Sequence, residues 1–196
     1  MSMENAKRRR IFALATVGYL GLLYGTLDII PYFFRWLFQL FGRGSYSHSI
    51  TAFLVFFGVV VLFRCRKQLA TLGPWRWIFL FAVGLGYAAI ISTVRVPTTQ
   101  LHSIQYGLLV WLIMESLRGT MPLSGIYTVS FAFTMMAAGA DEYLQSLLPS
   151  RNGMFAHVLL DGFAVFLAQV SIAIIHDLPT DKEFSEKSLV RKENRE

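Results

Sequence analysis

The residues best suited to chemistry lie close together in the stretch DEYLQSLLPSRNGMFAHVLLD, which occupies positions 141–161. It holds three acids, an arginine, a histidine and a glutamine, namely Asp141, Glu142, Asp161, Arg151, His157 and Gln145. An imidazole titrates near neutral pH, and a guanidinium holds phosphate or carboxylate in a fixed geometry. The combination indicates a binding site for an anion or a reaction centre. The alternative is a solvated rim between two apolar helices.

Helical spacing pairs several of these polar residues. His157 and Asp161 are four residues apart, so they share one helix face on which the carboxylate can orient the imidazole. His102 and Tyr106 repeat this spacing on an earlier apolar segment. In the alternative interpretation, the two residues of each pair satisfy each other's polar atoms and stabilise the packing of neighbouring helices.

The composition is typical of a membrane protein. Apolar residues make up 55% of the 196 residues and charged residues 15%, whereas soluble domains carry about 25% charged residues. The net charge of +6 does not indicate nucleic acid, because the basic residues form short clusters beside apolar segments. We therefore expect membrane lipids as partners and no nucleic acid.

The sequence contains little that indicates a cofactor. Its single cysteine, Cys65, excludes an intramolecular disulfide and argues against a thiolate metal site. It contains no zinc-binding, P-loop or dinucleotide-binding motif. We therefore expect no cofactor and assign no metal ligand.

The apolar residues gather in six segments that approach the length needed to cross ~30 Å of hydrocarbon. These segments span roughly residues 11–32, 48–63, 75–93, 101–117, 123–140 and 154–176. Each must be helical, because lipid offers no partner for backbone polar groups. The expected fold class is an all-α, polytopic membrane bundle of about six transmembrane helices.

Lysine and arginine predict the orientation. With the N-terminus in the cytoplasm, the inner segments hold 14 of the 18 basic residues, and the outer segments hold only Arg35, Arg43, Arg95 and Arg151. This bias predicts that both termini are cytoplasmic. We expect a multi-pass protein of the bacterial inner (cytoplasmic) membrane. The same topology places the polar residues of the second half at the outer face.

The last two segments resemble the VanZ-like family of membrane proteins. The family pattern has an Asp-Glu pair on an apolar helix, a Gln three residues after the Glu, and a Pro-x-Arg loop. A His followed four residues later by Tyr is typical of an earlier span. The matching residues here are Asp141, Glu142, Gln145, Pro149, Arg151, His102 and Tyr106. The family's Asp and Asn on the final helix are replaced by His157 and Asp161.

The VanZ-like resemblance covers about residues 75–175 and implies a division of the chain. Residues 1–72 would form an N-terminal two-span extension, whose amphipathic segment FFRWLFQLFGRG lies in the membrane interface or forms an aromatic belt. Residues 73–177 would form a VanZ-like four-helix membrane domain, and residues 178–196 a polar cytoplasmic tail. The resemblance also implies a role in the cell envelope, since the family is linked with glycopeptide resistance of the teicoplanin type.

The two residues that differ from the VanZ-like pattern, His157 and Asp161, belong to a second resemblance that rests on a single motif. The stretch SRNGMFAHVLLD is similar to the third motif of the type 2 phosphatidic acid phosphatases. In that family the His attacks phosphorus, the Asp orients it and the Arg holds phosphate oxygens, so His157 and Asp161 would be catalytic. The two companion motifs of that family are absent from the sequence.

The function favoured by the sequence is non-enzymatic or uncharacterised handling of an anionic envelope lipid or glycan precursor in an outward-facing polar pocket. The expected binding residues are Asp141, Glu142, Gln145, Arg151, His102 and Tyr106. Two alternatives remain open. One is a lipid phosphate phosphatase that uses His157, and the other is an accessory subunit of a larger membrane protein complex.

Overall fold

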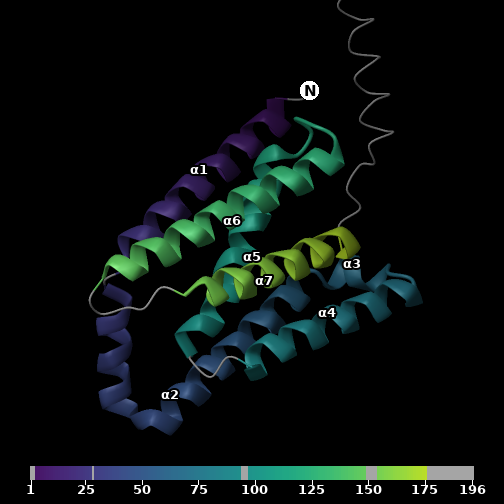
Figure 1. Ribbon diagram of the computed structural model, residues 1–196. Coiled ribbons are helices and arrows are strands. Elements are labelled where there is room, and N and C mark those ends of the chain that lie inside the picture. Colours follow the sequence, from purple (N-terminus) through teal and green to yellow (C-terminus); the bar gives the residue numbers. More distant parts are fainter. Residues whose placement is uncertain (1–2, 28, 94–96, 149–153, 176–196) are drawn as a thin grey trace, which may run out of the picture.

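The computed structural model describes residues 3–27, 29–93, 97–148 and 154–175. All regular elements among these residues are α-helices, which confirms the all-α fold class. In chain order they are α1 (Met3–Gly25), α2 (Ile29–Arg64), α3 (Arg66–Ala70), α4 (Pro74–Thr93), α5 (Pro97–Leu117), α6 (Leu123–Leu147) and α7 (Phe155–Ile175) (Figure 1).

Three of these helices, α4, α6 and α7, are long and apolar enough to cross a membrane, by length and composition alone. They coincide with the third, fifth and sixth apolar segments of the sequence. These helices indicate a membrane protein. The other three spans and the orientation of the termini stay predictions.

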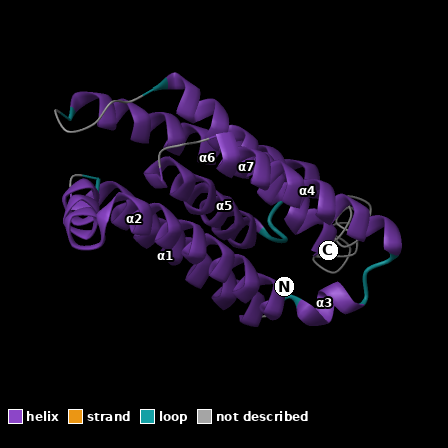
Figure 2. Cartoon of the chain, turned by 90° about the horizontal axis from the view of Figure 1, so that it is seen from below, coloured by secondary structure: helices purple, strands orange, loops and turns teal. Residues whose placement is uncertain are grey.

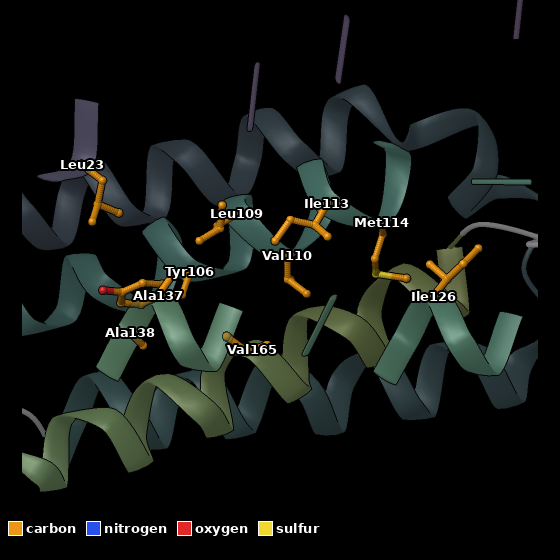
Figure 3. Packing of buried hydrophobic residues seen from close by; sticks show 10 residues of the cluster. All are labelled: Leu23, Tyr106, Leu109, Val110, Ile113, Met114, Ile126, Ala137, Ala138 and Val165. Carbon is orange, nitrogen blue, oxygen red and sulfur yellow. The ribbon is translucent and has the colours of Figure 1, made fainter. Parts of the chain in front are cut away.

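Helix α5 lies at the centre of the bundle and packs against α1, α6 and α7 (Figure 2). Its residues Tyr106, Leu109 and Val110 are completely buried. Together with residues of the neighbouring helices they form the main apolar cluster of the protein (Figure 3). This packing makes α5 the helix against which the polar residues of its neighbours can be positioned.

The outer surfaces of the helices are apolar as well. Large side chains such as Phe79 and Phe81 of α4 and Phe163 and Phe166 of α7 are exposed. A soluble monomer rarely leaves a continuous apolar surface open to water. In a bilayer the same side chains face acyl chains, so their exposure agrees with a membrane location.

Helix α1 belongs to the same bundle. Leu23 contributes to the main apolar cluster. The hydroxyl of Tyr19 donates to the backbone oxygen of Gln105 on α5 at 3.1 Å. The hydroxyl of Tyr24 donates to the backbone oxygen of Ala137 on α6 at 2.9 Å. These contacts tie α1 to later helices, while the division of the chain at residue 72 stays a prediction.

Helix α2 is interrupted at Gly42, which has φ 75° and ψ 166°. Glycine adopts such a positive φ without the steric penalty that a Cβ atom brings. The break separates the amphipathic segment, in which Phe33, Trp36 and Leu40 are exposed, from the apolar helix that follows. A short helix in the membrane interface and an aromatic belt at a helix end were the two interpretations of this segment, and both stay predictions.

An ion-pair network around the buried Glu115 joins the start of α1 to the end of α5. Glu115, only 4% exposed, accepts contacts from Arg8 at 2.9 Å and from Arg118 at 3.0 Å. Two arginines that the charge bias assigns to the same side of the membrane therefore lie at the same end of the bundle. The pairing also explains how a carboxylate is tolerated there, because an unpaired buried charge is expensive.

The contact between α4 and α7 gives a prediction about packing. A Cβ atom at Gly86 would lie 2.9 Å from Cδ1 of Leu167, whereas one at Gly84 would meet nothing within 4 Å. Gly86→Val should therefore lower the free energy of unfolding by about 1–3 kcal/mol, as overpacking does. Gly84→Val on the same helix is the matched control. Equal midpoints for the two variants in a detergent unfolding titration would contradict the close packing of α4 on α7.

Candidate functional site

Polar side chains from three helices meet inside the bundle, and we call them the polar cluster. They come from the start of α5, the end of α6 and the start of α7. The members joined by close contacts are His102, Tyr106, Asp141, Glu142, His157 and Asp161, and the buried Gln145 lies one turn beyond Asp141 on α6. All but the partly buried His157 are less than 10% exposed. The structure thus brings together six of the eight residues expected from the sequence to form a site, and it buries Gln145 on the same helix.

Tyr106 and Asp141 form the shortest polar contact in this cluster. The Tyr106 hydroxyl donates to Oδ2 of Asp141 at 2.6 Å, and both residues are buried. Tyr106 also belongs to the main apolar cluster, so its ring connects the core to the polar residues (Figure 3). A hydrogen bond to an ionised acceptor is about twice as strong as one between neutral groups. Tyr106 therefore fixes the position of α6 relative to α5 at this point.

Glu142 lies between two histidines and the start of α7. Its Oε2 accepts the backbone N–H of Met154 at 2.9 Å. Its Oε1 lies 3.2 Å from Nδ1 of His157 and 3.9 Å from Nδ1 of His102. One carboxylate therefore links α6 to α5 and to the first turn of α7.

Asp161 and His102 face each other without a hydrogen bond. Oδ2 of Asp161 lies 3.7 Å from Nδ1 of His102, which is longer than a hydrogen bond. Among the described residues neither atom has a hydrogen-bond partner, and neither does Oδ1 of Asp141. An unsatisfied buried polar group costs about 1–3 kcal/mol, so these atoms are candidates for contact with a ligand.

The polar contacts run between helices, not along them as the spacing suggested. His157 is next to Glu142, while Asp161 faces His102. The rings of His102 and Tyr106 meet edge to face with centroids 5.9 Å apart, and the Tyr106 hydroxyl is directed to Asp141. Residues four apart do share a helix face, but the nearer partner is on the adjacent helix in both cases.

Several sequence predictions lie outside the described residues. Arg151, the cation on which the expected anion site depends, is one of them, and so are Pro149 and the tail at 178–196. Among the described residues, the ion-pair partners of Glu142 and Asp161 are histidines. The described part of the site is therefore rich in acceptors and acidic in character.

One grouping was missed by the sequence analysis. His102, Glu142 and Asp161 each offer an atom, and these three atoms lie within 4.8 Å of one another. The sequence assigned no metal ligand, because it contains neither a cysteine cluster nor a zinc-binding motif. The available signal was topological, since all three residues were expected at the same face of the membrane.

A scan against protein-family models, a search of curated proteins and a search of solved structures found no match to this chain. The VanZ-like resemblance and the phosphatase resemblance therefore stay predictions. The geometry of the polar cluster is the basis on which a function can be proposed.

Proposed function

We propose that the protein is a multi-pass protein of the bacterial inner membrane that holds the hydroxyl-bearing headgroup of an anionic envelope lipid or glycan precursor. The polar cluster would be the binding site. The observation that carries this proposal is Oδ1 of Asp141, a buried acceptor that has no hydrogen-bond partner among the described residues. Hydroxyl groups of a glycerol or sugar would supply the missing donor.

The chemistry of the cluster supports recognition of hydroxyls. Ionised carboxylates are acceptors only, and each can take more than one hydrogen bond. Asp141 already accepts from Tyr106 through Oδ2, and Oδ1 of Asp141 has no partner in the part of the chain that the structure describes, so it would be open to a ligand. Arg151 would hold the phosphate or carboxylate of the same ligand, as the VanZ-like resemblance implies. The acidic residues would then bind the hydroxyls of the headgroup, and Arg151 would bind its negative charge.

The proposed topology has six spans and places the polar cluster at the outer face. The ends of α5, α6 and α7 that carry the cluster are opposite to the end where Glu115 pairs with Arg8 and Arg118. The bias of lysine and arginine supports a cytoplasmic position for that arginine-rich end. The polar cluster would therefore be accessible to ligands of the outer leaflet.

Cysteine labelling tests this orientation. In a Cys65→Ser background, a cysteine at Gly44 or Arg151 should react with a membrane-impermeant maleimide in intact cells. A cysteine at Thr71, in the turn between α3 and α4, should react only after the membrane is opened. Labelling of Thr71→Cys from outside would reverse the orientation and place the polar cluster on the cytoplasmic side.

Lipid preference tests the proposed ligand class. Purified protein should retain phosphatidylglycerol, whose headgroup is anionic and carries two hydroxyls, more strongly than phosphatidic acid, which lacks them. Native mass spectrometry of protein titrated with each lipid measures this preference. Equal retention of the two lipids would mean that hydroxyls are not recognised. A preference for phosphatidylethanolamine would mean that the acidic cluster attracts a cationic headgroup instead.

A second candidate function rests on the contact between His157 and Glu142. A carboxylate 3.2 Å from Nδ1 can orient the imidazole so that Nε2 attacks phosphorus. Glu142, and not Asp161, would then be the orienting acid. Phosphoryl transfer also needs several cations around the transferred group, and the ion-pair partners of these carboxylates among the described residues are histidines.

Phosphate release separates the two candidates. We expect no release of inorganic phosphate above background from phosphatidic acid incubated with the purified protein. Release that is lost in His157→Ala and in Glu142→Ala, but kept in Ser146→Ala, would favour the phosphatase. Ser146 is a suitable control because it is exposed on the same helix as Glu142 and donates to the backbone oxygen of Tyr143.

A further inference from the structure

Three potential metal ligands converge within the polar cluster. His102 comes from α5, Glu142 from α6 and Asp161 from α7, and one ligand atom from each lies within 4.8 Å of the others. The Nδ1 atom of His102 is 3.7 Å from Oδ2 of Asp161 and 3.9 Å from Oε1 of Glu142. Ligands from three different helices are what a site in a bundle core requires, because no single helix face can surround an ion.

A second observation concerns the hydrogen bonding of these atoms. The side chain of Asp161 is only 2% exposed and that of His102 10% exposed. Oδ2 of Asp161 and Nδ1 of His102 face each other, yet neither has a hydrogen-bond partner among the described residues. Buried polar atoms without partners are rare and indicate a missing ion, water or ligand. Here the two atoms lie 3.7 Å apart.

We propose that His102, Glu142 and Asp161 bind a divalent transition-metal ion, with Zn²⁺ as the best match. One imidazole and two carboxylates are a ligand set that zinc accepts in tetrahedral geometry. Two ionised carboxylates also neutralise the double charge of the ion. This matters inside a membrane bundle, where an uncompensated charge is very costly.

The distances fit this ion after a contraction. Zinc bonds of about 2.0–2.2 Å in a tetrahedron place ligand atoms roughly 3.4 Å apart. The pairs at 3.7 and 3.9 Å need to close by a few tenths of an ångström. The two carboxylates of Glu142 and Asp161, whose ligand atoms lie within 4.8 Å of each other, must approach by up to about 1.4 Å. Ca²⁺ and Mg²⁺ fit less well, because they prefer six or more oxygen ligands, and an imidazole favours transition metals.

The surroundings of Glu142 resemble those of a positioned ligand. Its Oε2 is held by the backbone N–H of Met154, while Oε1 faces both histidines. Hydrogen bonds of this kind orient a metal-binding carboxylate and tune its affinity. Three protein ligands leave a fourth position open. This position would accept a phosphate oxygen or hydroxyl of the headgroup, a step that rests on the proposed function, whereas metal binding itself does not.

Metal analysis of the purified protein tests the inference. Wild-type protein prepared without chelators should contain near-stoichiometric zinc by inductively coupled plasma mass spectrometry. After chelator treatment, addition of Zn²⁺ alone should raise the Tm. Asp161→Asn and His102→Gln should lose both the zinc and the rise in Tm. Glu115→Gln, which changes the buried acid at the other end of the bundle, should keep both.

The outcomes distinguish the metal site from the proposed function. Wild-type protein without zinc and without a Tm response would overturn the metal site, whatever lipids it binds. Zinc retained in Asp161→Asn and in His102→Gln would do the same. If these variants do not fold, Co²⁺ added to stripped wild-type protein is the deciding measurement. Tetrahedral ligation by the cluster should give intense d–d absorption at longer wavelength than aqueous Co²⁺ shows. The weak absorption of octahedral aqueous Co²⁺ alone would overturn the metal site. Metal without phosphatidylglycerol retention would overturn only the lipid proposal.

Discussion

Tyr106→Phe is expected to lower the free energy of unfolding by about 1.5–3 kcal/mol, the range for hydrogen bonds to charged groups. The Tyr106 hydroxyl donates to Oδ2 of Asp141 at 2.6 Å, and Oδ1 of Asp141 has no partner among the described residues. Loss of the hydroxyl therefore leaves a buried carboxylate without its donor. Equilibrium unfolding in mixed micelles measures the change.

A matched control for this prediction is Tyr87→Phe. The Tyr87 hydroxyl donates to the backbone oxygen of Ala164 at 2.9 Å, so the control removes one hydrogen bond to a neutral acceptor. Its expected cost is about 0.5–1.5 kcal/mol.

Asp141→Asn combined with Tyr106→Phe should cost less than the sum of the single changes, because the two groups interact directly. Strict additivity would contradict the hydrogen bond.

Glu142→Ala is expected to weaken the binding of phosphatidylglycerol by at least about 30-fold. Removal of one partner of a buried charged contact costs ~2–5 kcal/mol, and the lower end of that range corresponds to this factor. Glu142 contacts Met154 and His157 and lies 3.9 Å from His102. Its removal should therefore disorganise the cluster from both sides. Lipid titration followed by native mass spectrometry gives the ratio of dissociation constants.

Two further variants separate binding from folding in this experiment. Glu142→Gln keeps an oxygen that can accept the Met154 N–H, so it should retain more affinity than Glu142→Ala while losing the charge. Ser146→Ala, exposed on the same helix, should bind phosphatidylglycerol as the wild type does. Equal affinity in Glu142→Ala and Ser146→Ala would mean that Glu142 does not contact the ligand.

The convergence of the site residues was predictable from the sequence because it follows from counting spans. The start of α5, the end of α6 and the start of α7 all lie at the same end of the bundle. His102, Glu142 and Asp161 are each about six residues from these helix ends, so they lie at similar depth. The helical nature of each apolar segment was equally predictable, because backbone polar groups must be satisfied within the helix. The interruption of α2 at Gly42 coincides with the end of the amphipathic segment, although the sequence analysis did not assign it to this glycine.

The partners of the site residues were not predictable in the same way. Spacing places His157 and Asp161 on one helix face, but the rotation of α7 relative to α5 and α6 decides which neighbour each side chain meets. In the structure His157 meets Glu142, and Asp161 meets His102. The bond from Tyr106 to Asp141 likewise depends on how α5 and α6 pack. Such rotations arise from packing of all helices together and leave no local pattern in the sequence.

The most direct measurement of the central claim, that the polar cluster holds a headgroup, is the identification of lipids that co-purify from native membranes. Mass spectrometry of wild-type protein should find an anionic, hydroxyl-bearing lipid or glycan-linked precursor enriched over the bulk membrane. The same species should be missing from Glu142→Ala and present in Ser146→Ala. An identical lipid profile for all three proteins, matching the bulk membrane, would contradict the claim.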